Sequence, residues 1–223
     1  LGALAWALSQ IGSNDVEAVP VSAAQSAANV MVVAGLGVLG LVGYAFWERR
    51  SRHPMTPPRM VENRAFVGLN IATLMIYAAL SIMFFLLPFE LVDRRGLPSI
   101  DAGLAFLPFS LGVGLLSKTF GSLADKVGTR TMLIAGPVGA AIAYVWMAFG
   151  EEASLMLGVV GAMALLGLSF AVLVAPLTAA VMSSVDESDE GLASGINNAA
   201  SRIAQLAGIA LAAGVASFAG GYQ

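Results

Sequence analysis

Residues 120–130 read FGSLADKVGTR, and they place one acid and two basic residues in a chain that is otherwise mostly Leu, Ala, Gly and Val. Long apolar runs flank this stretch on both sides. A short charged connection between two such runs is typical of two membrane helices joined at one face of a bilayer. Gly121 and Gly128 suit a tight turn, but a turn alone does not explain why Asp125 follows Gly121 at this spacing.

The composition of the whole chain is that of a membrane protein. Of its 223 residues, 58% are hydrophobic and 11% are charged, against about 25% charged residues in soluble domains. The mean hydropathy is +0.83. The net charge of −3 offers no basic surface for nucleic acid, and the absence of cysteine excludes disulfides and thiolate metal sites. The only histidine, His53, lies in a Pro-rich connector, and the motifs of hydrolases, zinc enzymes and nucleotide-binding proteins are absent. We therefore expect no enzyme, no metal and no cofactor.

Six apolar runs are close to or above the ~20 residues that a membrane-spanning helix needs. Their continuous apolarity, with frequent Gly and Ala, favours helices over the alternating strands of a barrel. The runs lie at 29–47, 65–89, 101–120, 131–149, 154–182 and 192–219. The opening LGALAWAL, residues 1–8, is too short to span a bilayer and is interpreted as the end of a cut helix. The sequence therefore predicts an all-α integral membrane bundle of about six complete helices plus the cut one.

Basic residues are distributed unevenly between the two sides that these runs define. Eight Lys or Arg fall within 48–64 and 118–130, whereas only two, at 94–95, fall on the opposite side. Because Lys and Arg are enriched in cytoplasmic loops, we expect the connections 48–64, 121–130 and 183–191 to face the cytoplasm. The chain would then be a multi-pass protein of the cytoplasmic membrane.

Asp125 needs a group that stabilises its carboxylate near the membrane surface. It can cap a helix or lie against the positive end of another helix, with Lys126 and Arg130 as charge partners on the cytoplasmic face. Gly121 would allow two helices to approach closely where they leave the membrane. The alternative is an ordinary positively charged turn, and the spacing alone leaves both open.

The stretch from Gly121 to Arg130 resembles the G-x-L-a-D-r-x-G-r-[kr] signature of the major facilitator superfamily, in the copy carried by the C-terminal half. It departs slightly, because Lys126 replaces the usual Arg and Thr129 occupies a commonly basic position. Three further stretches resemble the fourteen-helix drug:proton antiporter branch: ERRSRHPMTPPRM at 48–60, DAGLAFLPFSLG at 101–112, and APLTAAVMSSVDESDEGLASGINNAASR at 175–202.

This resemblance implies a division of the chain. Residues 1–47 would hold the end of a cut helix and one further helix of an extra central hairpin, 48–64 a cytoplasmic linker, and 65–223 five helices of the six-helix C-terminal half. The N-terminal half and the last helix would be missing. In the family the signature latches the cytoplasmic gate, so Asp125 would find its partner in the missing half. The residues of the gate motif would be Gly121, Asp125, Lys126, Gly128 and Arg130.

The resemblance also implies a function, which is proton-coupled export of drug-like or amphipathic small molecules by alternating access. Its partners would be the lipid bilayer, the small-molecule substrate, protons and the missing N-terminal half. Glu90, Asp93 and Asp101 lie at span ends, so we expect the proton-coupling carboxylates elsewhere. Two alternatives stay open: a transport-inactive truncated segment or interaction module, and the same fold with another cargo such as a sugar, siderophore or lipid.

Two helices carry polar stripes that are candidates for the wall of a substrate cavity. Polar groups that face lipid are costly, so each stripe should face either a cavity or another helix. The first, within 65–89, consists of Asn70, Thr73, Tyr77, Ser81 and Phe84, and the second, within 192–219, of Asn198, Arg202 and Gln205. A helix that begins at Gly191 would place Arg202 about 16 Å along its axis. If the membrane segment instead begins near Ile203, Arg202 would reach the cytoplasmic surface.

Overall fold

The computed structural model describes residues 57–150 and 156–218, together with a few positions between 39 and 50. The cut helix expected at 1–8 and most of the run at 29–47 lie outside the described residues. The chain divides into two compact units, Leu1–Pro58 and Arg59–Gln223, and the second carries every feature discussed below. The division at 47 and 64 that the resemblance implies stays a prediction.

Every regular element in residues 57–150 and 156–218 is a helix. Helix α4 continues directly into a wider π-helical turn, η1, which follows Pro88; proline has no N–H for the regular ladder. The elements are α3 Pro58–Glu62, α4 Arg64–Phe89, η1 Glu90–Arg94, α5 Ser99–Leu104, α6 Leu107–Val127, α7 Thr129–Phe149, η2 Met156–Val160, α8 Gly161–Ser183, η3 Glu187–Asp189 and α9 Glu190–Phe218.

Four helical stretches of the described residues are long and apolar enough to cross a membrane. They are Arg64–Arg94, Ser99–Ala124, Thr129–Phe149 and Gly158–Ser183, and they correspond to four of the predicted runs. Helix α9 has 29 residues, and its first half carries the polar residues Asn197, Asn198 and Arg202. The predicted run at 192–219 is thus confirmed as a helix as far as Phe218.

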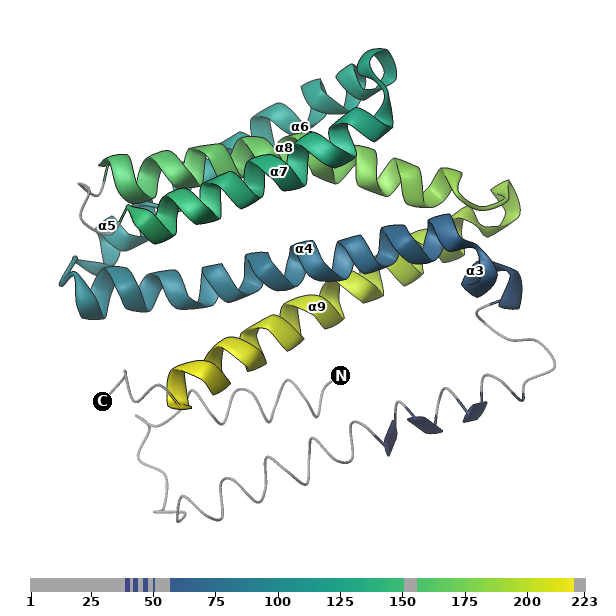
Figure 1. Cartoon of the computed structure of the whole chain (residues 1–223), viewed down its shortest axis with the longest axis horizontal. Helices are drawn as coiled ribbons and strands as arrows, with labels where there is room; N and C mark the ends of the chain where they lie inside the picture. Colours follow the sequence, from purple (N-terminus) through teal and green to yellow (C-terminus); the bar gives the residue numbers. More distant parts are fainter. Residues whose placement is uncertain are drawn as a thin grey trace. The chain divides into compact units, whose positions relative to one another are not determined.

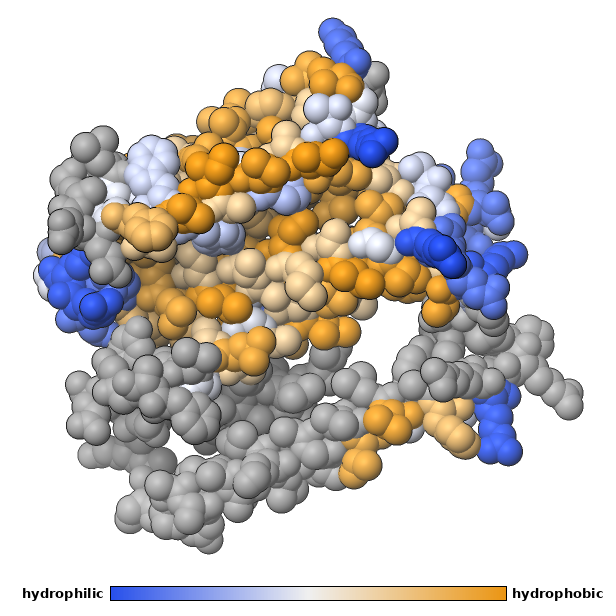
Figure 2. All heavy atoms as spheres, viewed as in Figure 1, coloured by the Kyte–Doolittle hydropathy of each residue, from blue (hydrophilic) through white to orange (hydrophobic). Residues whose placement is uncertain are grey.

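Helix α8 lies at the centre of the second unit. Of its most apolar window 56% is buried, against 11% to 22% for the other three spans. It packs along α6 and α7, while α4 pairs with α9 (Figure 1). Figure 2 shows apolar residues over the middle of the described helices and hydrophilic residues at their two ends, as expected of a bundle that crosses a bilayer.

The helices approach most closely at glycines, because glycine has no side chain to hold two helices apart. A Cβ added to Gly167 of α8 would meet Cα of Phe109 on α6 at 2.7 Å, and one added to Gly112 would meet the Gly167 carbonyl carbon at 2.9 Å. Such distances are too short for real Cβ atoms, so α6 and α8 pack here through their backbones. Gly121, which was expected to mark the close approach, would reach Ala175 at 3.4 Å, an ordinary contact.

The predicted ten-residue turn at 121–130 is wrong in extent. Helix α6 continues through Val127, and Gly128 alone connects it to α7. A helix satisfies its own backbone hydrogen bonds, so it need not end where the membrane ends, and the exposed Lys126 is solvated there. Gly128 has φ +93°, a backbone conformation that residues with a side chain rarely adopt. This explains why a glycine occupies the position.

One end of the unit is held together by polar contacts between segments far apart in sequence. Asn63 caps α4 by accepting from the N–H groups of its first turn at 3.0 and 3.2 Å, and its Nδ2 donates to the Ser184 carbonyl at 2.6 Å. Arg59 Nη2 lies 2.7 Å from one Asp189 carboxylate oxygen and 2.9 Å from the other. Hydrogen bonding to Asp189 raises the pKa of Arg59 above its usual value. Buried Met60 packs between these segments.

Figure 1 shows α3, the α8–α9 connection and the α6–α7 turn at the same end of the unit. Successive spans place every second connection on the same side of the membrane, and the expected orientation assumes this alternation. That this end faces the cytoplasm stays a prediction.

Candidate functional site

The half of the α4 stripe nearer to α3 forms a polar contact with α9. Asn197 Nδ2 donates to Thr73 Oγ1 at 2.9 Å and lies 3.5 Å from Asn70 Oδ1. Asn70 and Thr73 also donate to carbonyls of their own helix, both at 2.9 Å. Thr73 is fully buried, so these polar groups satisfy one another inside the helix pair. Asn70 and Thr73 therefore lie in a helix–helix hydrogen-bonding seam.

Farther along both helices, their backbones come into contact. A Cβ added to Gly208 of α9 would lie 2.6 Å from the Ala78 carbonyl oxygen and would also collide with the Ser81 hydroxyl. Ala204 and Ala212, one turn to either side, are 2% and 3% exposed. The small residues Ala204, Gly208 and Ala212 thus form the face of α9 that packs on α4, and this face encloses Ser81.

A cavity of about 420 Å³ opens beside this crossing, in the middle of α4. Aromatic and aliphatic side chains form most of its wall, and three polar side chains, from Tyr77, Ser81 and Gln205, reach it. Its lining residues are Tyr77, Leu80, Ser81, Phe84, Phe85, Phe109, Gln205 and Ile209. Four residues predicted from the two stripes therefore line one cavity.

The wall of this cavity is part of a connected set of aromatic rings. The Phe84 and Phe109 ring centroids lie 5.0 Å apart at 71°, and Phe109 contacts Phe170 of α8 at 5.6 Å and 64°. Tyr77 meets the same Phe170 edge-on at 6.4 Å and 88°. Edge-to-face packing of this kind is favourable and fixes the rings in place, so the cavity has a preformed aromatic surface.

The two remaining residues of the α9 stripe are not among the residues that line this cavity. Asn198 and Arg202 are exposed and do not lie on the face that packs on α4. The helix begins at Glu190, so Arg202 lies about 18 Å along its axis. Arg202 forms no salt bridge with a described acid. Whether these two residues line a larger cavity, and at which residue the membrane begins, stay predictions.

The gate motif occupies the end of α6 and the start of α7. Asp125 lies in the last turn of α6, and its side chain is outside the described residues. Lys126 and Arg130 are exposed, and Gly128 is the connector. No described side chain caps the first turn of α7. The structure therefore brings the motif together at one end of the bundle, away from the aromatic cavity.

Asn197 and Phe109 belong to this region and were not among the predicted residues. The sequence offered two adjacent asparagines, and only the helix packing selects Asn197 for the seam. Phe109 comes from α6, whose apolar residues give no sign of which ones face α4. No three acidic or histidine side chains of residues 57–150 and 156–218 gather as a metal site requires.

Comparison with known proteins identifies the family. The sequence profile of the Major Facilitator Superfamily matches residues 69–223, which include the seam, the cavity and the gate motif. The chain belongs to this superfamily of transport proteins.

Its relatives include named resistance proteins. The lincomycin resistance protein of Streptomyces lincolnensis is 36% identical over 169 residues, covering 74% of this chain and 34% of that protein. The multidrug resistance protein Stp of Mycobacterium tuberculosis is 30% identical over 182 residues, covering 81% and 34%. The puromycin resistance protein pur8 of Streptomyces alboniger is 26% identical over 180 residues, covering 79% and 36%. The chain thus spans about a third of the length of these relatives.

Proposed function

We propose that the natural polypeptide carrying this sequence is a proton-coupled secondary transporter that exports drug-like or amphipathic small molecules. The observation that carries this proposal is the aromatic cavity between α4, α6 and α9. Its rings offer apolar surface, while Tyr77, Ser81 and Gln205 offer a few hydrogen bonds, which is the balance that drug-sized ligands need. The printed names of the relatives, which refer to lincomycin, puromycin and multidrug resistance, support the same substrate class.

Export would proceed by alternating access, with this helical unit rocking as a body against the rest of the transporter. The backbone contact of α6 with α8 and of α4 with α9 supports such rigid movement, because neither pair has a deformable side-chain layer at its crossing. No carboxylate of the described residues lines the aromatic cavity. The residues that couple proton movement to export therefore lie in other parts of the transporter.

Efflux of a fluorescent amphipathic dye tests this proposal. The natural polypeptide is expressed in an efflux-deficient host, and dye loss is followed before and after a protonophore. We expect energy-dependent efflux that the protonophore abolishes. Phe84→Ala removes a ring from the cavity and should slow efflux about two- to tenfold, since a lost aromatic contact is worth about 0.5–1.5 kcal/mol. The matched control is Phe149→Ala, at the end of α7 with 86% of the side chain exposed, which should leave efflux unchanged. Normal expression without efflux, or equal rates for both variants, would contradict the proposal.

We further propose that the protein lies in the cytoplasmic membrane with 48–64, 121–130 and 183–191 on the cytoplasmic side. Because the chain has no cysteine, single exposed serines can be replaced and labelled with a membrane-impermeant maleimide. Ser122→Cys and Ser188→Cys should be labelled only in inside-out vesicles, and Ser99→Cys only in right-side-out vesicles or cells. The reverse pattern would overturn the orientation.

A further inference from the structure

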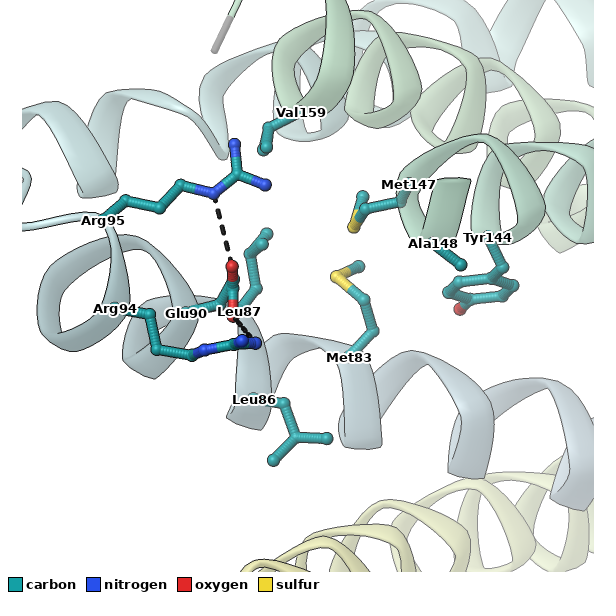
Figure 3. Close-up of a pocket in the computed structure, with 10 residues that line it drawn as sticks. All are labelled: Met83, Leu86, Leu87, Glu90, Arg94, Arg95, Tyr144, Met147, Ala148 and Val159. Carbon is teal, nitrogen blue, oxygen red and sulfur yellow. Dashed lines mark hydrogen bonds and ion pairs between the residues drawn. The ribbon is translucent and has the colours of Figure 1, made fainter. Parts of the chain in front are cut away.

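A second cavity, of about 380 Å³, lies at the other end of α4, where η1 faces α7 and η2 (Figure 3). It shares no lining residue with the aromatic cavity. Charged side chains lie at one side of it, and methionines, aliphatic residues and one tyrosine form the remainder. Its lining residues are Met83, Leu86, Leu87, Glu90, Arg94, Arg95, Tyr144, Met147, Ala148 and Val159.

Two arginines and one acid are the charged residues among the described side chains that line this cavity. Glu90 is shared between two arginines: Arg94 Nη1 donates to one carboxylate oxygen at 2.8 Å, and Arg95 Nε donates to the other at 3.3 Å. Asp93, the remaining acid of η1, is exposed and does not line the cavity. Arg95 uses Nε for its ion pair, and Figure 3 shows its terminal nitrogens on the side of Val159 and Met147. A partly buried guanidinium in this position can bind a further anionic oxygen.

The opposite side of the cavity contains a hydroxyl that lacks an acceptor. Tyr144 Oη is buried and has no hydrogen-bond partner among the described residues. Buried polar groups of folded proteins are almost always paired, so this hydroxyl is available to donate a hydrogen bond to a bound ligand. Met83 and Met147 lie between Tyr144 and the arginines in Figure 3. Methionine side chains adapt to flexible apolar ligands.

The cavity also lies at a defined depth in the bilayer. The span Arg64–Arg94 has 31 residues, or about 46 Å of helix, against a hydrocarbon core of about 30 Å. If the span is centred on this core, about 8 Å of helix extends beyond it at each end, which places Arg94 and Arg95 at the level of the lipid headgroups. Tyr144 precedes the end of α7 by about 7 Å of helix and lies deeper. The cavity thus extends from the headgroup level into the hydrocarbon.

We propose that this cavity binds a phospholipid with an anionic headgroup. A phosphate oxygen accepts from Arg95, an acyl chain lies along Met83 and Met147, and an ester carbonyl accepts from Tyr144. Phospholipid is the amphipathic anion with all three groups that every membrane supplies at high local concentration.

Retention of lipid by the purified natural polypeptide tests this proposal without any need for transport. The protein is equilibrated in micelles with equal amounts of phosphatidylglycerol and phosphatidylcholine, and bound lipid is counted by native mass spectrometry. We expect one tightly held phosphatidylglycerol. Arg95→Gln should lower its retention about fivefold, as expected for one basic residue at an anionic headgroup. Tyr144→Phe should weaken retention of both lipids, whereas Arg130→Gln, an exposed arginine at the other end of the unit, is the matched control.

Three results would overturn the proposal. Equal retention of the two lipids, with no effect of Arg95→Gln in a protein that keeps its thermal unfolding temperature, would exclude an anionic headgroup site. Displacement of phosphatidylglycerol by soluble glycerol phosphate at equal concentration would show that the site takes free phosphate groups. Displacement by the exported dye would show that the cavity belongs to the transport route.

Discussion

Asn197 connects α9 to α4 by hydrogen bonds to Thr73 and Asn70. The sequence instead predicts its neighbour Asn198 as part of the polar stripe of this helix. Successive residues of a helix are about 100° apart, so adjacent asparagines face different surroundings. The stripe on α4 could be predicted because its polar residues recur at helical spacing in an apolar run. The choice between the two asparagines of α9 could not be predicted, because it depends on which face packs on α4.

Asn197→Ala should therefore destabilise the protein and Asn198→Ala should not. The first removes the donor to Thr73 Oγ1, and hydrogen bonds between membrane helices contribute about 0.6–1.7 kcal/mol. The second removes an exposed amide and should change stability by less than about 0.5 kcal/mol. Thermal unfolding of the purified natural polypeptide in detergent measures both. Equal effects of the two variants would mean that the hydrogen bonds of the seam make no specific contribution to stability.

At the scale of elements, apolar runs located helices well and connections poorly. The runs at 65–89 and 131–149 reproduce α4 and α7 within two residues. The run at 101–120 does not: the chain leaves the helix at Ala105 and Phe106, shortly before Pro108, and α6 then continues to Val127. Apolarity reports where a helix contacts lipid, whereas its end is set by backbone signals such as Gly128.

The pairing of α4 with α9 should depend on the absence of a side chain at Gly208. Gly208→Ala forces the Ala78 carbonyl away and should cost about 1–3 kcal/mol, as overpacking in cores does. Gly195→Ala, on the same helix with nothing within 4 Å of the added carbon, should be neutral or stabilising by up to about 1 kcal/mol. Chemical denaturation with helical circular dichroism as readout compares the two. A neutral Gly208→Ala would show that the helices can separate at no cost.

For the molecule as a whole, the sequence predicted the family and half of the residues that line one cavity, but not which part of the α4 stripe faces the cavity and which part faces α9. Tyr77, Ser81, Phe84 and Gln205 line the cavity, whereas the first turns of the same stripe are used in the seam. Periodicity identifies a polar face and cannot say whether the partner of that face is a helix or a ligand. That difference depends on where α9 crosses α4.

The predicted role of the gate motif belongs to the scale of the whole molecule, because Asp125 would contact the rest of the transporter. Asp125→Asn in the natural polypeptide keeps the size of the side chain but removes its charge. We expect efflux of the amphipathic dye to fall at least about tenfold, the cost of losing one charge-assisted contact of on the order of 1.5–3 kcal/mol. Dye efflux at matched expression measures this, with Lys118→Gln, an exposed charge earlier in α6, as the control. Full efflux by Asp125→Asn would exclude the latch.

The pairing of α4 with α9 also has a consequence for how the protein is made. The first half of α9 carries the polar residues Asn197, Asn198 and Arg202, and Nδ2 of Asn197 reaches Thr73, 124 residues earlier in the chain. During synthesis, α4 would therefore have to remain near the translocon until α9 emerges, so that the two insert together. Substitutions of Asn70 or Thr73 should then reduce the amount of protein that reaches the membrane, even where the finished transporter would tolerate them.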